Sequence, residues 1–125
     1  MTYLLDVNAL IAALWTTHAR HAVTDAWLKG KQVALCPISE MGFLRISTHP
    51  RALGAVMADA EKLLGEFYKD VSPKFVPADL SASGLGAKDS DAVTDHYLAR
   101  LADRHKMKLA TLDGNIAHPA VELIA

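Results

Sequence analysis

Cysteine, aromatic residues and basic charge are all scarce in this chain. There is one cysteine among 125 residues, so no disulfide can form within the chain. We expect Cys36, which lies in an apolar run, to be a small core residue of a reducing cytoplasm. The formal net charge is −1, which does not indicate a broad phosphate-binding surface. A local basic patch beside an acidic site remains compatible with this balance.

Long apolar stretches, repeats and low-complexity segments are also missing. The longest apolar run, residues 9–15, is far too short to cross a bilayer, and no basic segment precedes the first apolar stretch, so no signal peptide is expected. Hydrophobic residues make up 51% of the chain and charged residues 22%, which is ordinary for a folded protein. We therefore predict a single cytoplasmic domain over residues 1–125, without membrane association.

Short apolar runs alternate with segments of helical periodicity along the whole chain. The runs of strand length span residues 3–5, 32–36, 74–76, 109–112 and 121–124. The helical segments span about residues 9–15, 21–28, 37–48, 55–68 and 90–106, the last with Ser90 or Thr94 as its N-cap. Residues 79–90 are typical of a loop. Apolar strands between helices predict an α/β fold, with a central parallel sheet covered on both faces.

Four carboxylates lie beside these apolar runs. Asp6 and Asp113 directly follow predicted strands, and Glu40 lies in the first turn of the helix after another. Asp95 begins the helix before the strand that leads to Asp113. Functional groups of parallel sheets gather beyond the carboxyl ends of the strands, so the four acids are expected to converge. Together they would repel one another, whereas Mg²⁺ or Mn²⁺ takes carboxylate oxygens as ligands and assists phosphoryl chemistry.

Each acid also has a simpler interpretation. Asp6 suits a helix N-cap, Glu40 and Asp95 suit the first turn of a helix, and Asp113 before a glycine suits a turn. Only the joint arrangement of the four indicates a site.

Several other polar side chains have weaker claims. Asn8 is placed to supply a neutral oxygen or orient a water, and Thr111 to fix the angle of a carboxylate. Arg45, in the same predicted helix as Glu40, is the best candidate for contacting phosphate. The pair His18 and His21 has a zinc-like spacing but no cysteine or acid partner, which favours an unspecialised surface role.

The order and spacing of these motifs resemble those of PIN-domain proteins, and more narrowly those of VapC-type ribonuclease toxins of prokaryotic toxin–antitoxin pairs. The resemblance covers nearly the whole chain and rests on four segments, residues 1–10, 39–46, 93–102 and 109–113. It implies an α/β/α sandwich. It also implies Mg²⁺- or Mn²⁺-dependent endoribonuclease activity that leaves 5′-phosphate and 3′-hydroxyl ends, a cognate antitoxin and a homodimer.

The resemblance extends to the individual site residues. The family's acidic positions fall on Asp6, Glu40, Asp95 and Asp113, and its polar companions fall on Asn8 and Thr111. One ambiguity concerns Asp91, four residues before Asp95, which is placed to assist it or replace it.

Two alternatives belong to other functional classes. A non-catalytic PIN-like module would bind RNA or protein, but it would be expected to lack some of the acids. A different metal-dependent phosphoesterase would act on DNA, and analysis of products from RNA and DNA would separate it from a ribonuclease.

Overall fold

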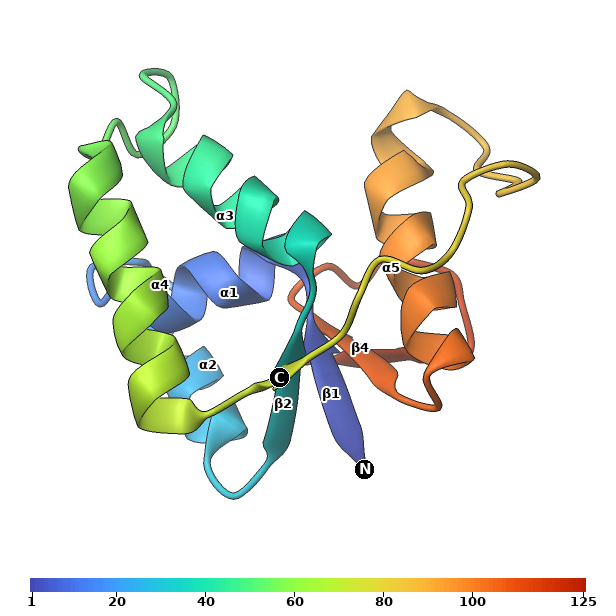
Figure 1. Cartoon of the computed structure of the whole chain (residues 1–125), viewed down its shortest axis with the longest axis horizontal. Helices are drawn as coiled ribbons and strands as arrows, with labels where there is room; N and C mark the ends of the chain where they lie inside the picture. Colours follow the sequence, from blue (N-terminus) through green and yellow to red (C-terminus); the bar gives the residue numbers. More distant parts are fainter.

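The first strand of the chain forms the centre of the sheet. The computed structural model describes residues 1–125, and its five strands are all parallel, in the order β3-β2-β1-β4-β5 (Figure 1). The elements in chain order are β1 (Thr2–Leu5), α1 (Val7–Leu14), α2 (His21–Leu28), β2 (Gln32–Leu35), α3 (Pro37–Thr48), α4 (Met57–Val71), β3 (Lys74–Phe75), the 3₁₀ helix η1 (Ser90–Ala92), α5 (Val93–Arg104), β4 (Lys108–Thr111) and β5 (Val121–Leu123).

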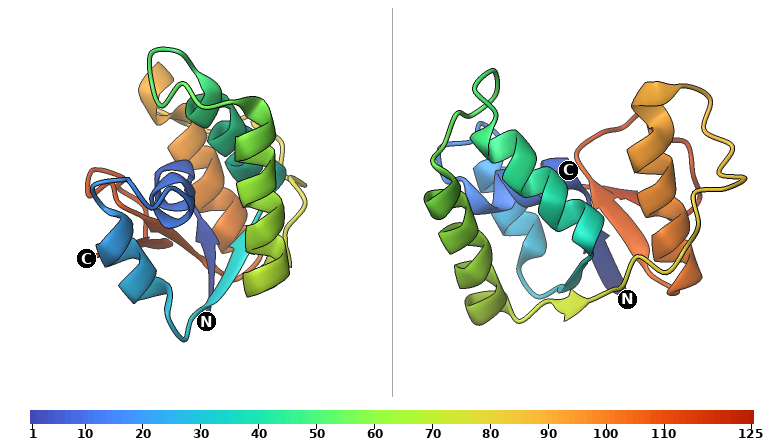
Figure 2. Two further views of the ribbon diagram at one scale, coloured as in Figure 1. Left: turned by 90° about the vertical axis from the view of Figure 1, so that its left-hand side faces the viewer. Right: turned by 45° about the horizontal axis from the view of Figure 1, so that its top comes forward.

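Alternate side chains of the sheet feed two separate hydrophobic cores. Leu5 and Val33 pack with residues of α1, α3 and α4, whereas Leu4 and Leu109 pack with α5 on the opposite face. Figures 1 and 2 show the same division, with α5 standing apart from the other helices. Because successive strand residues point to opposite faces, fully apolar strands require this covering on both sides. The predicted α/β/α arrangement is confirmed.

Helices α1 and α3 approach each other closely at Gly42. A Cβ atom built on Gly42 would lie 2.5 Å from a methyl carbon of Val7, so a larger residue would force the two helices apart. Farther along, the ring of Trp15 stacks on Phe43 with centroids 6.4 Å apart, and its Nε1 donates to Ser47. Phe43 lies in the core, and Trp15 packs against it. The close approach at Gly42 places the N-terminal ends of α1 and α3 side by side at the carboxyl edge of the sheet.

The predicted elements are found, with small differences at their ends. The helix predicted over residues 55–68 runs from Met57 to Val71, and the first helix begins directly after Asp6. The predicted cap of α5 is wrong. Neither Ser90 nor Thr94 caps this helix, because a 3₁₀ turn precedes it and the carboxylate of Asp89 accepts the backbone N–H of Ala92. None of the helices has the length and hydropathy that a bilayer span requires.

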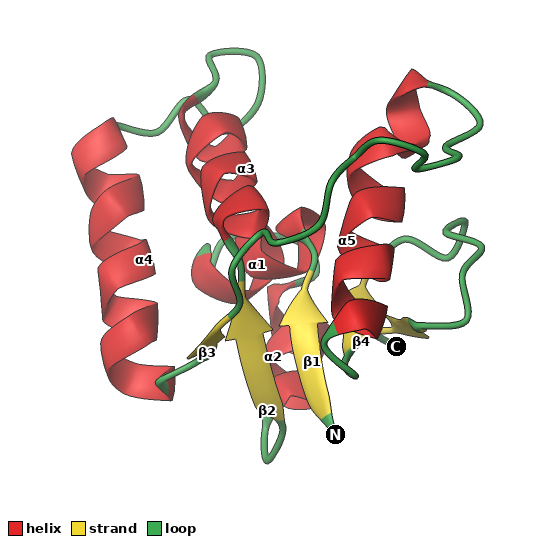
Figure 3. Ribbon diagram, turned by 45° about the vertical axis from the view of Figure 1, so that its right-hand side comes forward, coloured by secondary structure: helices red, strands yellow, loops and turns green.

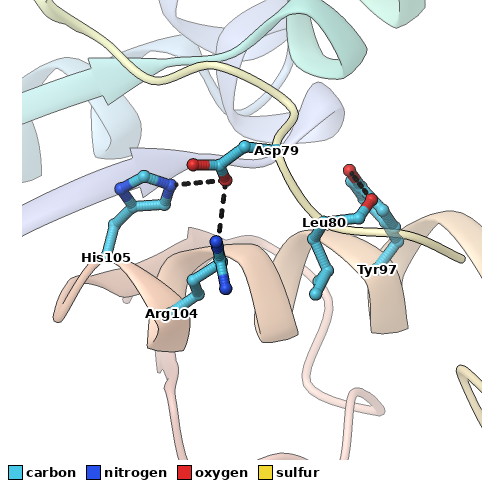
Figure 4. Close-up of polar contacts among 5 residues, drawn as sticks. All are labelled: Asp79, Leu80, Tyr97, Arg104 and His105. Carbon is cyan, nitrogen blue, oxygen red and sulfur yellow. Dashed lines mark hydrogen bonds and ion pairs between the residues drawn. The ribbon is translucent and has the colours of Figure 1, made fainter.

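The segment between β3 and η1 has no helix or strand, as predicted, but it is attached to α5. Asp79 lies 3.2 Å from Arg104 and 2.9 Å from His105, and Tyr97 donates a hydrogen bond of 2.7 Å to the carbonyl of Leu80 (Figure 4). These contacts hold the start of the segment against α5, so its remainder arches toward the N-terminal end of that helix (Figure 3).

Candidate active site

Asp6 occupies the junction between β1 and α1. One carboxylate oxygen accepts the backbone N–H of Val7 at 2.7 Å, and the other accepts the hydroxyl of Thr111 at 2.7 Å. The pairing of β1 with β4 brings Thr111 beside Asp6, although 105 positions separate them. Asp6 is only 2% exposed. It is therefore the cap of α1 and, at the same time, a buried acid at the carboxyl edge of the sheet.

Asn8 and Thr111 fix the turn that follows β4. The amide nitrogen of Asn8 donates to the Thr111 hydroxyl at 3.1 Å, while its amide oxygen accepts the backbone N–H of Leu112 at 3.1 Å. The Thr111 hydroxyl also accepts the backbone N–H of Asp113 at 3.1 Å. Asp113 itself accepts the N–H of Asn115, which is the turn geometry expected of an aspartate before glycine. The network holds Asp113 in the same neighbourhood as Asp6.

Three of the predicted acids share one electrostatic environment. Burial raises the pKa of Asp6, although its hydrogen bonds act in the opposite direction, and the charge of Asp113 raises it further. Burial and the charges of Asp6 and Asp113 raise the pKa of Asp95 to about 6. None of the three carboxylates forms an ion pair with a lysine or arginine. Such a group is destabilised by its own repulsion until a cation joins it.

Two cavities meet at Asp95. The first, of about 720 Å³, is lined by Asp6, Asn8 and Asp95 at one end and by Arg45 with apolar residues of α1 and α3 elsewhere; we refer to it as the Arg45 cavity. The second, of about 390 Å³, lies between residues 86–96 and the turn after β4; we refer to it as the Lys88 cavity. Its polar lining residues include Lys88, Asp91, Asp95, His96, Asp113 and Asn115. Asp6 thus lines the first cavity, Asp113 lines the second, and Asp95 lines both.

Glu40 is not with the other acids in this arrangement. Its carboxylate accepts a hydrogen bond of 2.6 Å from the hydroxyl of Tyr68 on α4, and it lines neither cavity. Its charge does not contribute to the raised pKa values of Asp6 and Asp95. The structure therefore brings together Asp6, Asp95 and Asp113, with Asn8 and Thr111 between them, and leaves Glu40 on the α4 side of α3.

The donor chemistry of the site fits a hard divalent cation. Carboxylate oxygens without a counter-ion are the ligands that Mg²⁺ and Mn²⁺ prefer. With the present side-chain positions, no three His, Cys, Asp or Glu residues are grouped closely enough to hold an ion. The two histidines of the zinc-like spacing serve other contacts, because a ring nitrogen of His21 bonds the carbonyl of Ala12 and that of His18 accepts the N–H of Arg20.

Two residues near the site were missed by sequence reasoning. Ser39 is buried and donates a hydrogen bond of 2.7 Å to the carbonyl of Leu5, which ties the first turn of α3 to the end of β1. Its position directly before Glu40 was the available signal. Tyr68, the partner of Glu40, lies in the last turn of an amphipathic helix, and nothing in the local sequence distinguishes it from a packing residue.

The fold is similar to that of solved structures. VapBC2 from Rickettsia felis bound to a DNA fragment from its promoter superposes with a TM-score of 0.64 at 15% identity, over 98% of this chain and 97% of that chain. FitAcB from Neisseria gonorrhoeae gives 0.63 at 20% identity, over 100% and 97% of the two chains. At these identities the likeness establishes the architecture.

Sequence comparison establishes the family. No family model matches the chain. However, Ribonuclease VapC38 of Mycobacterium tuberculosis (strain ATCC 25618 / H37Rv) is 34% identical over 126 residues, which cover 90% of this chain and 86% of the relative. Ribonuclease VapC39 of the same strain is 34% identical over 131 residues, covering 96% and 94%. With this identity and coverage, the relatives show the family: the chain belongs to the VapC ribonuclease family.

Proposed function

We propose that this chain is a metal-dependent endoribonuclease, a single PIN domain over residues 1–125 that acts in the cytoplasm as the toxin of a type II toxin–antitoxin pair. The observation that carries the proposal is the cluster of Asp6, Asp95 and Asp113, three carboxylates without counter-ions at the junction of two cavities. Membership of a family whose named relatives are ribonucleases supports RNA as the substrate.

Asp6, Asp95 and Asp113 are the residues that would hold Mg²⁺ or Mn²⁺. A bound cation lowers the pKa of an attacking water and offsets charge that develops on the phosphoryl oxygens. Thr111 and Asn8 keep Asp6 and the turn before Asp113 in place, because their hydrogen bonds connect β4 to the start of α1. In-line attack by water leaves a 5′-phosphate and a 3′-hydroxyl.

Two further acids belong to the proposed site. Asp91 is exposed on the wall of the Lys88 cavity, four residues before Asp95, and it assists there in a supporting role. Glu40 is the fourth acid of the proposal, although its carboxylate is bonded to Tyr68 in the structure.

Arg45 is the proposed contact for an RNA phosphate. It is exposed, lines the same cavity as Asp6 and Asp95, and forms no ion pair or hydrogen bond within the chain. Lys88 lies on the other side of Asp95 and also forms no ion pair. Two cations that flank the acids give RNA local contacts even though the net charge of the chain is −1.

The proposed partners are a cognate antitoxin and a second copy of the chain. Met41 and Leu53, on the wall of the Arg45 cavity, are 58% and 40% exposed, and Val56 and Met57 near the start of α4 are 64% and 46% exposed. Apolar surface of this kind is typical of protein contacts. The similar solved structures bear the names of complexes, VapBC2 and FitAB, which supports an antitoxin partner.

The function is tested by incubating purified, inhibitor-free protein with a total RNA pool and, in parallel, with DNA. We expect RNA cuts in the presence of Mg²⁺ or Mn²⁺ that disappear with EDTA. Fragment ends should be 5′-phosphate and 3′-hydroxyl, which ligation before and after phosphatase treatment reveals. Cyclic 2′,3′-phosphate ends would contradict attack by water, and cleavage of DNA alone would favour the phosphoesterase alternative.

The site assignment is tested in the same assay with Asp6→Asn. Asparagine keeps the shape and can still accept the Thr111 hydroxyl, so we expect a folded protein whose activity is lower by orders of magnitude. Asp25→Asn is the matched control, because Asp25 is an exposed aspartate on α2, away from both cavities. Equal activity of the Asp6 variant and the control would refute the assignment.

A further inference from the structure

The hydrogen bond between Tyr68 and Glu40 joins α4 to the helix that borders the site. Helices α3 and α4 lie side by side in both Figures 1 and 2, and the Tyr68 hydroxyl approaches the Glu40 carboxylate to 2.6 Å. The ring of Tyr68 packs against the core shared by α1, α3 and α4. Burial and the neighbouring carboxylate raise the pKa of Tyr68, so its hydroxyl keeps the proton that it donates. The contact is a charge-assisted hydrogen bond at a fixed place.

The same contact turns Glu40 away from the other acids. Ile38, Met41 and Arg45 lie on one face of α3 and line the Arg45 cavity. Glu40 follows Ile38 by two positions, which is about 200° around a helix. Its Cβ therefore lies on the side of α3 opposite to the face that lines the Arg45 cavity. From that side its carboxylate reaches Tyr68 on α4, so joining the other acids requires it to give up this hydrogen bond.

Electrostatics favour the α4 side while no cation is bound. The charges of Asp6 and Asp113 already raise the pKa of Asp95, the charge of Asp113 raises that of Asp6, and none of the three forms an ion pair. A fourth carboxylate among them would add to the repulsion. Tyr68 offers Glu40 a hydrogen bond away from that field, whereas a divalent cation in the site would reverse the balance and attract it.

We propose that Tyr68 is a positioning residue that competes with the divalent cation for Glu40. This inference rests on the proposed function and deepens it. Loading the site requires Glu40 to exchange its bond with Tyr68 for the acidic cluster, so Tyr68 lowers the apparent affinity for the cation. The packing of α4 on α3 thereby regulates the site, since any movement of Tyr68 away from α3 releases Glu40.

The test is Mn²⁺ binding, measured by electron paramagnetic resonance of the free ion, in the absence of RNA. We expect Tyr68→Phe to bind Mn²⁺ roughly tenfold more tightly, since a hydrogen bond to a charged group is lost only from the cation-free form. Tyr3→Phe is the matched control, because Tyr3 packs against Trp27 and its hydroxyl makes no hydrogen bond within the chain. Its affinity should equal that of the wild type.

A second pair of variants identifies the residue through which Tyr68 acts. Glu40→Gln should weaken Mn²⁺ binding, and adding Tyr68→Phe to it should change nothing further. Unchanged affinity in the single Tyr68 variant would overturn the inference. Weaker affinity would overturn it too, because Tyr68 would then orient Glu40 as a ligand.

The outcomes separate this inference from the proposed function. If Asp6→Asn abolishes Mn²⁺ binding while Tyr68→Phe leaves it unchanged, the metal site stands and the role of Tyr68 fails. If the wild-type protein binds no Mn²⁺ at all, both fail. Thermal unfolding supplies a second readout. Tyr68→Phe should lower Tm without metal yet increase the rise in Tm that Mn²⁺ produces, whereas a purely structural role would lower Tm equally in both conditions.

Discussion

Asp6 and Asp95 belong to the same candidate site, but the molecule holds them by opposite means. Asp6 ends a central strand, is 2% exposed, and accepts hydrogen bonds from the backbone of Val7 and from Thr111. Asp95 lies in the first turn of α5, is only partly buried, and accepts no hydrogen bond. The sheet edge thus provides one acid whose position is fixed, and the helix provides a second whose carboxylate is free to respond to a ligand.

The same contrast holds for the regions around the two acids. At the junction of β1 and β4, side chains and backbone groups are tied together by Asn8 and Thr111, and no buried side-chain polar atom in the molecule is left without a partner. The segment before α5 is attached near its start by Asp79 and Leu80 and near its end by Asp89. In its middle, Arg100 of α5 donates to the carbonyl oxygens of Gly84 at 3.2 Å and Leu85 at 3.5 Å. The sheet edge is therefore fixed by buried and partly buried hydrogen bonds, whereas the segment is held to α5 by contacts that are mostly exposed.

The largest effect is expected from Thr111→Val, which breaks the hydrogen bonds that fix Asp6 at the edge of the sheet. The change removes the hydroxyl that serves Asp6, Asn8 and the backbone of Asp113 at once. We expect catalytic efficiency or Mn²⁺ affinity to fall by about 10- to 100-fold, as for other supports of metal ligands. Stability should fall by about 1–3 kcal/mol, because buried polar groups lose their partners.

Thr24→Val is the matched control for this prediction. Thr24 is also fully buried, and its hydroxyl donates to the carbonyl of Arg20 in α2, far from the acids. Urea unfolding should show a lower stability for both variants. Mn²⁺ affinity should fall only in Thr111→Val. A Thr111 variant that loses stability but keeps full activity would show that the fixed side has no functional role.

A smaller effect is expected from the start of α5, where Asp95 titrates. Its pKa is raised from the ordinary 3.8 to about 6 in the folded protein, so the folded form binds the proton more tightly than the unfolded form. The associated stability is therefore complete below about pH 4 and is lost as pH rises through about 6. Asp95→Asn should remove this slope and stabilise the metal-free protein above pH 6 by about 1–2 kcal/mol, after allowance for solvent screening.

Urea unfolding between about pH 4 and pH 7.5 in EDTA measures this slope. The pKa of Asp6 is also raised, which adds a slope of the same sign, so the comparison is between wild type and Asp95→Asn at each pH. Asp25→Asn is the control, because Asp25 is exposed on α2 and lines neither cavity. Parallel curves of stability against pH for wild type and the Asp95 variant would show that the other carboxylates do not raise the pKa of Asp95.

The smallest effect is expected from the anchor of the segment before α5. Asp79 has a lowered pKa, first through its hydrogen bond to His105, and its partners Arg104 and His105 hold the segment to the helix. Asp79→Asn should speed backbone amide exchange over residues 80–88 while leaving Tm nearly unchanged. Asp103→Asn, an exposed acid on the same helix without an ion pair, is the control. Equal exchange in both variants would assign the anchoring to Tyr97 and Arg100, which donate hydrogen bonds to carbonyl oxygens of the same segment.

Local patterns predicted most of the fold, because they depend on neighbours in sequence. The bounds of α2 were predicted to the residue, and Pro37 correctly marked the start of α3. The cap of α5 was missed, because the 3₁₀ turn at its start transfers the capping role to Asp89, and this turn has no strong sequence signal.

The site was predictable only in part for a related reason. Strand ends placed Asp6 and Asp113 at one edge once a parallel sheet was inferred, and the structure brings them together with Asp95. The direction in which Glu40 points depends on Tyr68, which is 28 positions away on another helix. Because the rotamer of Glu40 depends on this distant partner, the local sequence of neither helix predicts it.

The central position of β1 has a consequence for how the protein is made. Asp6 is synthesised before its hydrogen-bond partner Thr111, which follows 105 positions later. Until β4 has emerged, β1 lacks one of its two neighbours, and the carboxylate of Asp6 remains in water without the threonine that fixes it. The nascent chain therefore carries no assembled site until β4 has been made.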